Sequence, residues 1–304
     1  MPRIHDPYLL CALYLFASPE GAERNDHLGG SGFIAGYKSQ DGTMIHLYAV
    51  TNRHVIEDGF TVLRLNKLLG GYDIMETSKN SWLLHPEDDV AICPIGPDHH
   101  YHKFSVISAA EDDEKSLFVT EKKVKKYNLG VGDEVLMVGR FLSHQGSKQN
   151  LPLARFGSIA MMPIETIENS LGNKREHFLV EIRSVSGFSG SPVFVYDLPF
   201  NYAGVRPEPF GQFLLGIDCG HMPKAKSLLE SGIAAIVPAW RILELLEDEQ
   251  LKQMRKEEEQ IRLEQRKKMG VIVPDSAKAQ FTRDDFEVAL KKASRKIPPK
   301  NSGD

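Results

Sequence analysis

The sequence predicts an all-β fold over most of its length. From about residue 9 to 195, short apolar or alternating runs are separated by Gly, Pro, Asn and Asp, and no helical period is sustained. Short strands bounded by turn residues at this spacing are typical of an antiparallel barrel or sandwich. The chain has 304 residues, of which 41% are hydrophobic, and so it can bury one large core or two smaller ones.

The strands are predicted from the apolar runs in chain order. A β-rich segment at residues 11–16 ends in a Ser-Pro-Glu-Gly turn. Further strands are expected at residues 32–37, 44–51, 61–65, 89–95, 134–139, 156–161, 178–182 and 192–195. The charged insert 109–126 is followed by a Gly-Val-Gly-Asp turn, and we expect it to connect two β units.

Helices are predicted only after Pro238. Apolar residues at helical spacing indicate a helix at 240–246, and a Glu/Lys/Arg/Gln-rich stretch with a thin apolar stripe continues to residue 268. A helix that runs into solvent explains this stretch better than a coiled coil, because the heptad pattern is weak. Thr282 and Asp285 have the spacing of a capping box, which predicts a last helix at 282–297 before a disordered end.

Charge and hydropathy exclude several classes of partner. The formal net charge is −4, so nothing global indicates nucleic acid or an anionic membrane as a partner. The apolar run at residues 9–17 is too short to cross a bilayer, and the mixed charge before it disfavours a secretory signal. We therefore expect neither a nucleic-acid nor a membrane partner.

Three cysteines, Cys11, Cys93 and Cys219, are far apart and form no CxxC pair. They predict buried free thiols rather than a disulfide framework or a zinc site, and so favour a cytoplasmic location.

The histidines at 99, 100 and 102 lie in a Gly/Pro/Asp-bounded loop without paired Cys or Glu spacing. A solvated loop explains them better than a metal, and no cofactor is expected.

The strongest local motif is Ser-Gly-Phe-Ser-Gly-Ser-Pro-Val at residues 186–193. A nucleophilic serine needs a tight turn whose backbone N–H groups converge on the developing oxyanion. Glycines on both sides of Ser189 permit such a turn and a close approach by substrate. A Gly/Ser surface turn is the alternative when this motif is taken alone.

Two further residues make the catalytic interpretation more specific. His54 ends a β-run, and histidine is a natural general base because its pKa lies near neutral pH. Asp89 opens an apolar strand, where a buried carboxylate would orient the imidazole. Each alone is more often structural, but the chain order His, Asp, Ser on a β-rich chain is that of the chymotrypsin type.

These motifs resemble those of trypsin-like serine peptidases over about residues 9–247. The resemblance includes the Gly-rich strand at 29–34, the histidine and aspartate motifs, Gly-x-Ser-Gly-x-Pro at 187–192, the strands at 213–217 and 232–238, and the closing helix. Among these peptidases the sequence is more similar to bacterial HtrA-like protease domains than to digestive enzymes, but no PDZ-like segment is evident after residue 247. The resemblance implies two six-stranded antiparallel β-barrels with a helical C-terminal extension, divided as 1–110, 111–247 and 248–304.

The resemblance also assigns roles to individual residues. It implies that Ser189 is the nucleophile, His54 the general base and Asp89 the orienting acid, with the N–H groups of Gly187 and Ser189 as the oxyanion hole. Asp88 competes for the acid role, and we prefer Asp89 because it directly precedes the strand. Phe188 replaces the acid that pairs with a new N-terminus in digestive enzymes, so no activation of that kind is implied.

Substrate preference is less determined by the sequence. The segment Asp218, Cys219, Gly220 and His221 is expected near the rim that pairs with the substrate backbone, and Arg183 stands where the family often places the base of the specificity pocket. An inward Arg183 would prefer an acidic side chain. The alternative, which we favour, is that Arg183 pairs with Glu181 on an exposed strand face.

Three functions remain open at this stage. The first is a serine endopeptidase that acts on proteins or peptides through an acyl-enzyme. The second is a catalytically silent relative that binds peptides in the same cleft. The third, compatible with the first, is an effector recruited by a protein partner through the helices at 248–268 and 282–297.

Overall fold

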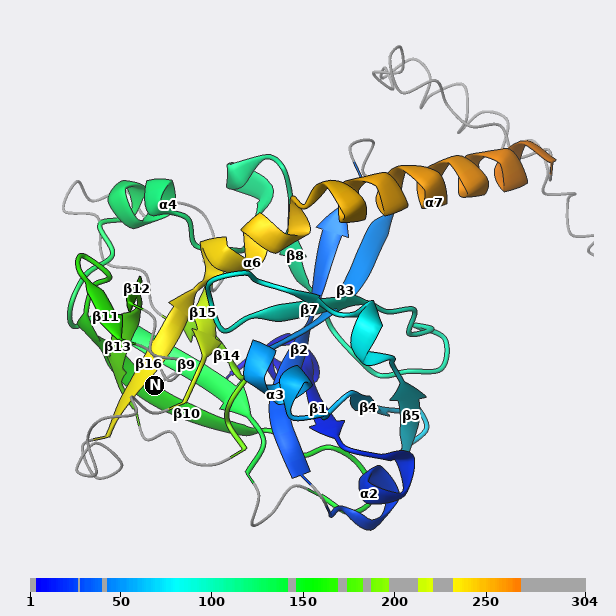
Figure 1. Ribbon diagram of the computed structural model, residues 1–304, viewed down its shortest axis with the longest axis horizontal. Helices are drawn as coiled ribbons and strands as arrows, with labels where there is room; N and C mark the ends of the chain where they lie inside the picture. Colours follow the sequence, from blue (N-terminus) through cyan, green and yellow to red (C-terminus); the bar gives the residue numbers. More distant parts are fainter. Residues whose placement is uncertain are drawn as a thin grey trace, which may run out of the picture. The chain divides into compact units, whose positions relative to one another are not determined.

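A computed structural model describes residues 4–26, 28–39, 43–141, 146–168, 174–182, 187–196, 213–220 and 232–268 (Figure 1). The chain divides into two compact units, Met1–Arg255 and Lys256–Asp304. The helix predicted at 282–297, the proposed pocket residue Arg183 and the rim residue His221 lie outside the described residues.

The N-terminal half of the first unit is an open eight-stranded sheet. Its order is β5-β4-β1-β2-β3-β7-β6, and β8 pairs with β2 in parallel. The strands are β1 (Ala12–Phe16), β2 (Leu28–Lys38), β3 (Ile45–Thr51), β4 (Val62–Asn66), β5 (Tyr72–Glu76), β6 (Leu83–Leu84), β7 (Ala91–Pro94) and β8 (Ile107–Ala109). The prediction that this half forms a closed barrel is therefore wrong. The edge strands β5 and β6 do not pair, and β6 has only two residues with which to do so.

The C-terminal half is the closed six-stranded antiparallel barrel that the sequence predicted. Its order is β10-β13-β16-β15-β14-β9. The strands are β9 (Glu134–Gly139), β10 (Leu153–Met161), β13 (Phe178–Glu181), β14 (Pro192–Val195), β15 (Phe213–Asp218) and β16 (Ile233–Pro238). A separate hairpin is formed by β11 (Thr166–Glu168) and β12 (Lys174–Glu176).

Short helices precede or connect the strands along the chain. They are α1 (Asp6–Leu10), α2 (Pro19–Arg24), α3 (Arg53–Glu57) and α4 (Glu121–Lys126), with 3-10 turns η1 (Lys79–Ser81) and η2 (Asp113–Lys115). The helix α2 forms where the sequence suggested only a turn, because Ser18 accepts a hydrogen bond from the N–H of Gly21 and Pro19 occupies the first helical turn.

The C-terminal helices follow the prediction in place and type. They are α6 (Ala239–Leu246) and α7 (Glu249–Lys268). The first compact unit extends into α7, because Leu251 and Arg255 are buried, whereas the predicted tail begins at residue 248. Within the described parts of the chain, no helix is both long enough and apolar enough to cross a membrane.

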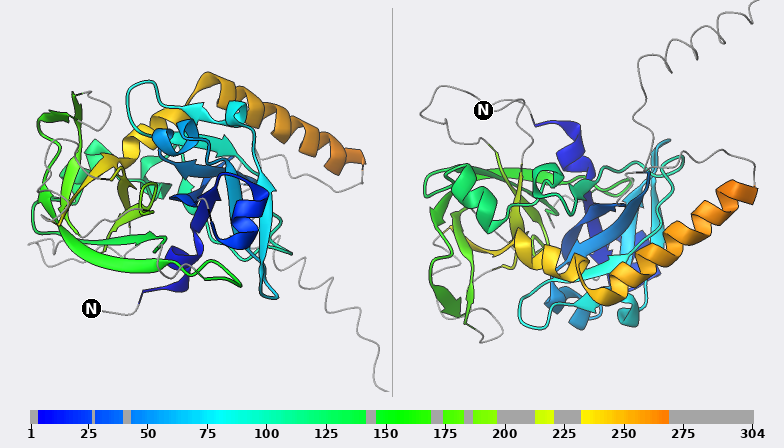
Figure 2. Two further views of the ribbon diagram at one scale, coloured as in Figure 1. Left: turned by 60° about the horizontal axis from the view of Figure 1, so that its bottom comes forward. Right: turned by 90° about the horizontal axis from the view of Figure 1, so that it is seen from above.

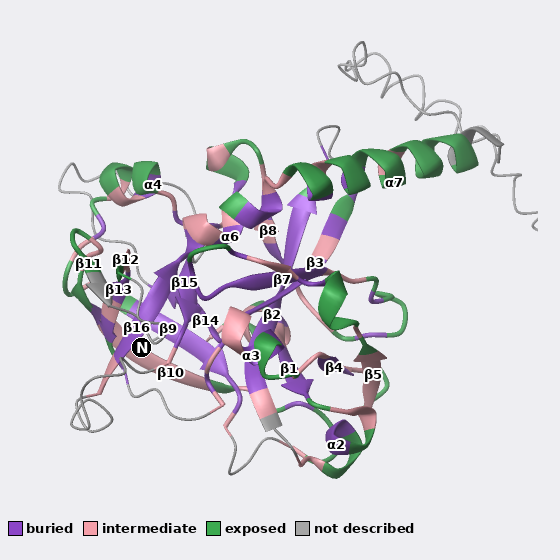
Figure 3. Ribbon diagram, in the orientation of Figure 1, coloured by how far each residue is buried: buried purple, intermediate pink, exposed green. Residues whose placement is uncertain are grey.

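One hydrophobic cluster joins the open sheet to the barrel. It combines Phe33 and Ile92 of the sheet, Leu136 and Phe194 of the barrel, and Ile242 of α6. The helix α6 packs on β7 as well as on β15 and β16, so it contacts both halves (Figure 2). Figure 3 shows that the strands around this interior are largely buried, whereas α7 is mostly exposed.

Candidate active site

His54 lies on the first turn of α3, directly after β3. Asn52 keeps an extended backbone before the helix, and its side-chain amide donates to the carbonyl oxygen of Asp89 at 2.8 Å. The backbone N–H of His54 donates to Asp89 Oδ1 at 2.9 Å. These two bonds fix the end of β3 to the start of β7 before any contact with the imidazole ring is considered.

Asp89 is fully buried at the turn that leads into β7. Its Oδ2 lies 2.7 Å from His54 Nδ1, so both carboxylate oxygens contact the same residue. A proton on Nδ1 donates to the carboxylate and leaves Nε2 as the acceptor. The arrangement therefore selects the tautomer in which His54 can accept a proton on its outer nitrogen.

The surroundings of His54 raise its pKa. Burial lowers the pKa of the ring, but the hydrogen bond and charge of Asp89, with smaller contributions from Asp58 and Asp218, outweigh this effect. The His54 side chain is 32% exposed, whereas that of Asp89 is 1% exposed. The pair thus has a buried acid and a base that solvent can reach.

Ser189 lies on a turn between two glycines with positive φ, Gly187 at 93° and Gly190 at 88°. The turn is anchored to β2 through Ser31. The N–H of Ser31 donates to the Ser189 carbonyl at 2.7 Å, and its hydroxyl donates to the Gly187 carbonyl at 2.8 Å. A side chain at position 190 would meet the Ser31 carbonyl oxygen at 2.0 Å, so this close approach requires glycine.

The turn of Ser189 and the helix of His54 meet at Gly30 of β2. A Cβ at Gly30 would lie 2.5 Å from the Ser189 carbonyl oxygen and 2.8 Å from Val55 Cγ2. The absent side chain of Gly30 thus lets the two segments approach each other. Within the described residues, no hydrogen bond joins the Ser189 hydroxyl to the His54 ring.

The expected substrate rim divides into buried and accessible positions. Asp218 and Cys219 are buried; Asp218 O accepts from Gly190 N at 2.9 Å, and Cys219 Sγ contacts the Ala235 carbonyl at 3.2 Å. Gly220 lies beside the proposed nucleophile, since a Cβ there would be 3.5 Å from Ser189 Oγ. Of the described residues in this predicted set, Gly220 is thus adjacent to the Ser189 hydroxyl.

Asp88, the competing acid, lies apart from His54. Its Oδ2 forms an ion pair with Arg241 Nε of α6 at 3.1 Å, whereas His54 contacts Asp89. Of the two acids, Asp89 is therefore the one that contacts His54. Sequence analysis did not assign Asn52 or Ser31, although both lie inside the quoted motifs; their roles depend on contacts with residues far along the chain.

The cysteines are free and buried, as predicted. Burial raises the pKa of all three thiols, which makes them poor nucleophiles and poor metal ligands at neutral pH.

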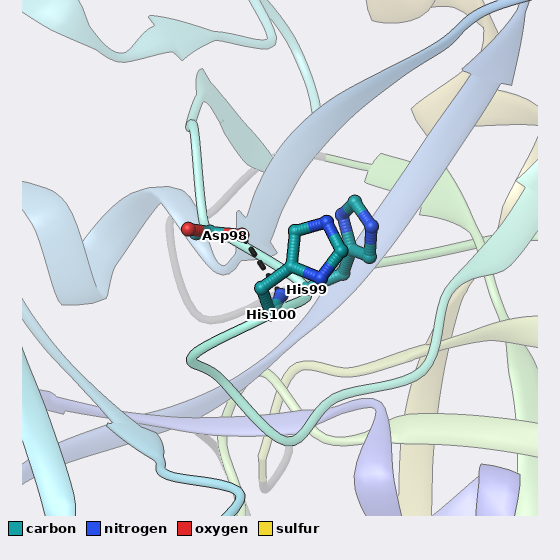
Figure 4. A group of neighbouring side chains, drawn as sticks. All are labelled: Asp98, His99 and His100. Carbon is teal, nitrogen blue, oxygen red and sulfur yellow. Dashed lines mark hydrogen bonds between the residues drawn. The ribbon is translucent and has the colours of Figure 1, made fainter.

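Asp98, His99 and His100 place possible metal-ligand atoms within 4.8 Å of one another, and all three are exposed (Figure 4). The Asp98 carboxylate accepts from the His100 backbone N–H at 2.8 Å, and the centroids of the two histidine rings lie 3.9 Å apart with the rings tilted by 41°. The carboxylate is therefore engaged in the loop itself, and we assign no metal to it.

A closed barrel and an open sheet thus meet with a His–Asp pair and a serine turn at their junction. The structure matches protease domains of the HtrA type and of MamO. No protein-family model matches the chain, and no curated protein matches its sequence.

Three solved structures illustrate this similarity. The MamO protease domain from Magnetospirillum magneticum is 14% identical, with a TM-score of 0.47 and coverage of 81% of this chain and 100% of that one. A variant of the HtrA-type protease AlgW with a tripeptide is 17% identical, with a TM-score of 0.46 and coverage of 79% and 60%. Deg5 is 16% identical, with a TM-score of 0.43 and coverage of 79% and 88%.

Proposed function

We propose that this protein is a serine endopeptidase with His54, Asp89 and Ser189 as its catalytic triad. One observation carries the proposal: the carboxylate of the buried Asp89 lies 2.7 Å from His54 Nδ1, and the helix that bears His54 meets the Ser189 turn at Gly30. A buried acid that fixes the tautomer of a half-exposed histidine supplies a base for a neighbouring hydroxyl.

In the proposed reaction, Ser189 Oγ attacks the peptide carbonyl and transfers its proton to His54 Nε2. The N–H groups of Gly187 and Ser189 stabilise the oxyanion. Collapse of the tetrahedral intermediate breaks the C–N bond, and His54 returns the proton to the leaving amine. Water then attacks the acyl-enzyme by the same route, which releases the acid and restores Ser189.

The proposed substrate is an extended segment of a protein or peptide. Its backbone would run past Gly220, where an added Cβ would lie 3.5 Å from the Ser189 hydroxyl oxygen. A peptide library tests the two alternatives for Arg183: selection of an acidic side chain would support a pocket role, and no such selection is expected if Arg183 pairs with Glu181, the alternative that we favour. The three buried free thiols support a reducing location, and we propose the cytoplasm.

A fluorophosphonate probe tests the proposal, because it reacts with an activated serine. We expect the wild type to be labelled and Ser189→Ala to be unlabelled. Ser191→Ala is a matched control: Ser191 lies two residues away, is fully buried, and should remain dispensable for labelling. Labelling that persists in Ser189→Ala, or is lost equally in Ser191→Ala, would contradict the assignment of Ser189.

A second candidate is a peptide-binding module without cleavage. The absence of a Ser189–His54 hydrogen bond within the described residues favours it, although such bonds are often formed only with substrate bound. A folded wild type that binds peptides but is neither labelled nor able to cleave them would support this second function. Recruitment through α7 is compatible with both, because from residue 256 to 265 its side chains are mostly exposed.

A further inference from the structure

Asp88 is a buried carboxylate next to the proposed catalytic acid. Its side chain is 1% exposed, and neither of its oxygens has a hydrogen-bond partner within the described structure. It stands between Glu87 and Asp89 in the turn of residues 85–90, which we call the acid turn. A buried carboxylate without hydrogen bonds needs a nearby cation if it is to remain ionised.

His85 does not supply that cation. Its Nδ1 accepts hydrogen bonds from the backbone N–H groups of Asp88 at 2.9 Å and Glu87 at 3.2 Å. The ring proton therefore resides on Nε2, which donates to Glu244 Oε2 at 2.9 Å. Although Nδ1 lies 3.8 Å from Asp88 Oδ2, it presents a lone pair to the backbone rather than a proton to the carboxylate.

Arg241 of α6 is placed to neutralise Asp88. Its Nε lies 3.1 Å from Asp88 Oδ2, its Nη1 2.8 Å from Glu244 and its Nη2 3.9 Å from Glu176 of β12. The Arg241 side chain is only 23% exposed, so water screens the ion pair incompletely. One guanidinium thus ties the acid turn to the C-terminal helix and to the β11–β12 hairpin.

The consequence concerns Asp89, because two consecutive buried carboxylates repel each other. Burial raises the pKa of Asp88, and the charge of Arg241 is the largest of the neighbouring charges that oppose this rise. His177 is also buried, and burial lowers its pKa, so this ring contributes little positive charge near neutral pH. Arg241 is therefore the principal counter-charge that allows both acids to occupy one turn.

We propose that Arg241 is a positioning residue for the proposed triad. By neutralising Asp88 it keeps the acid turn in the conformation in which both oxygens of Asp89 contact His54. The catalytic consequence rests on the proposed function, but the positioning itself does not. It makes α6, more than 150 residues away from Asp88 in sequence, part of the support of the site.

The test is a double-mutant cycle with the full chain, read by NMR titration of His54 in protein labelled at histidine. We expect Arg241→Met to lower the pKa of His54 and to weaken its Nδ1 proton signal, because Asp89 withdraws. Asp88→Asn removes the charge that Arg241 balances. The double variant Asp88→Asn/Arg241→Met should therefore recover the wild-type titration.

Arg175→Met is the matched control. Arg175 contacts the same turn at Glu87, with Nε 3.4 Å from its carbonyl oxygen and Nη2 3.5 Å from its exposed carboxylate. The Glu87 carboxylate is 57% exposed, whereas that of Asp88 is 1% exposed, so loss of the Arg175 pair should have little effect and the pKa of His54 should not change. If the wild type is active, Arg241→Met should lower kcat at least tenfold with KM little changed, and the double variant should restore it.

Three outcomes would overturn the proposal: a pKa of His54 that Arg241→Met leaves unchanged or raises, a decrease that Asp88→Asn does not reverse, or an equal effect of Arg175→Met. If Arg241→Met does not fold, the comparison is made within the Asp88→Asn background, where loss of Arg241 should have no effect. A wild type that is never labelled would refute the endopeptidase, while the His54 titration would still decide the role of Arg241.

Discussion

The molecule contains two clusters of buried charged side chains, and they differ in the groups that these side chains contact. In the first, Arg64 and Arg140 are both fully buried and stack on Tyr14 and Phe16; the Arg140 guanidinium lies 4.3 Å from the Phe16 ring centroid and 4.4 Å from that of Tyr14. In the second, the acid turn, carboxylates meet histidines and Arg241. We call the first the arginine cluster.

The arginine cluster has charges of one sign and no carboxylate partner among its described contacts. Arg140 donates to the carbonyls of Leu15 and Gly29, while its Nε and Nη2 have no hydrogen-bond partner in the described structure. Burial lowers the pKa of the guanidinium to about 9. Its contacts with the Tyr14 and Phe16 rings and with the Gly29 carbonyl hold the end of β9 against β1 and β2.

The acid turn brings the carboxylates of Asp88 and Asp89 against the cation Arg241 and against His54, a histidine that solvent reaches. The His54 side chain is 32% exposed, whereas Arg64 and Arg140 are fully buried. The comparison teaches that burial of a charge does not by itself indicate function. A titratable group must also be partly accessible and must face a group with which it can exchange a proton.

The largest expected effect is that of removing the charge of Asp89. Asp89→Asn should lower kcat/KM by roughly 10³–10⁴-fold, because the amide selects the wrong tautomer of His54. Steady-state cleavage of a peptide substrate measures this loss. Asp88→Asn alters the neighbouring buried carboxylate in the same way and should retain most activity; equal losses in the two variants would contradict the distinction between the two acids.

The next effect concerns the stability of the arginine cluster. Arg140→Ala should reduce the free energy of unfolding by about 2–4 kcal/mol, because the side chain that fills the space between two rings is removed. Arg140→Met keeps most of that volume and removes an uncompensated charge, so it should be neutral or stabilising. Chemical denaturation measures both, and a Met variant as unstable as the Ala variant would show that the charge itself is required.

The smallest effect is a pH dependence of kcat/KM, which we expect from the His54–Asp89 pair and not from the arginine cluster. Because the pKa of His54 is raised above the usual value of about 6.5, kcat/KM should decrease about tenfold per pH unit below that raised pKa. Because the pKa of His54 is higher in the folded state than in the unfolded state, protonation of His54 stabilises the fold at pH values below the unfolded-state pKa. This contribution to the free energy of unfolding is lost as the pH rises through the folded-state pKa. An acid limb centred below 6.5 would contradict the assigned base.

Several features of the molecule were determined by local sequence. The strands β9 and β14 have the predicted bounds, because their apolar runs are sharply delimited by turn residues and their side chains are almost all buried. The helix α6 follows from the spacing of its apolar residues. The short helices and the two-residue strand β6 were not predicted, since single caps and tertiary pairing decide them.

The sequence by itself determined which residue types were available for the site: a histidine after a strand, an acid before one and a serine between glycines. Only the tertiary structure decided that Asp89 rather than Asp88 contacts His54, that Ser31 and Gly30 hold the serine turn, and that the N-terminal sheet stays open. The physical reason is that a sequence pattern reports the neighbours of a residue along the chain. The charge balance at the acid turn instead depends on Arg241, which folding alone brings to Asp88.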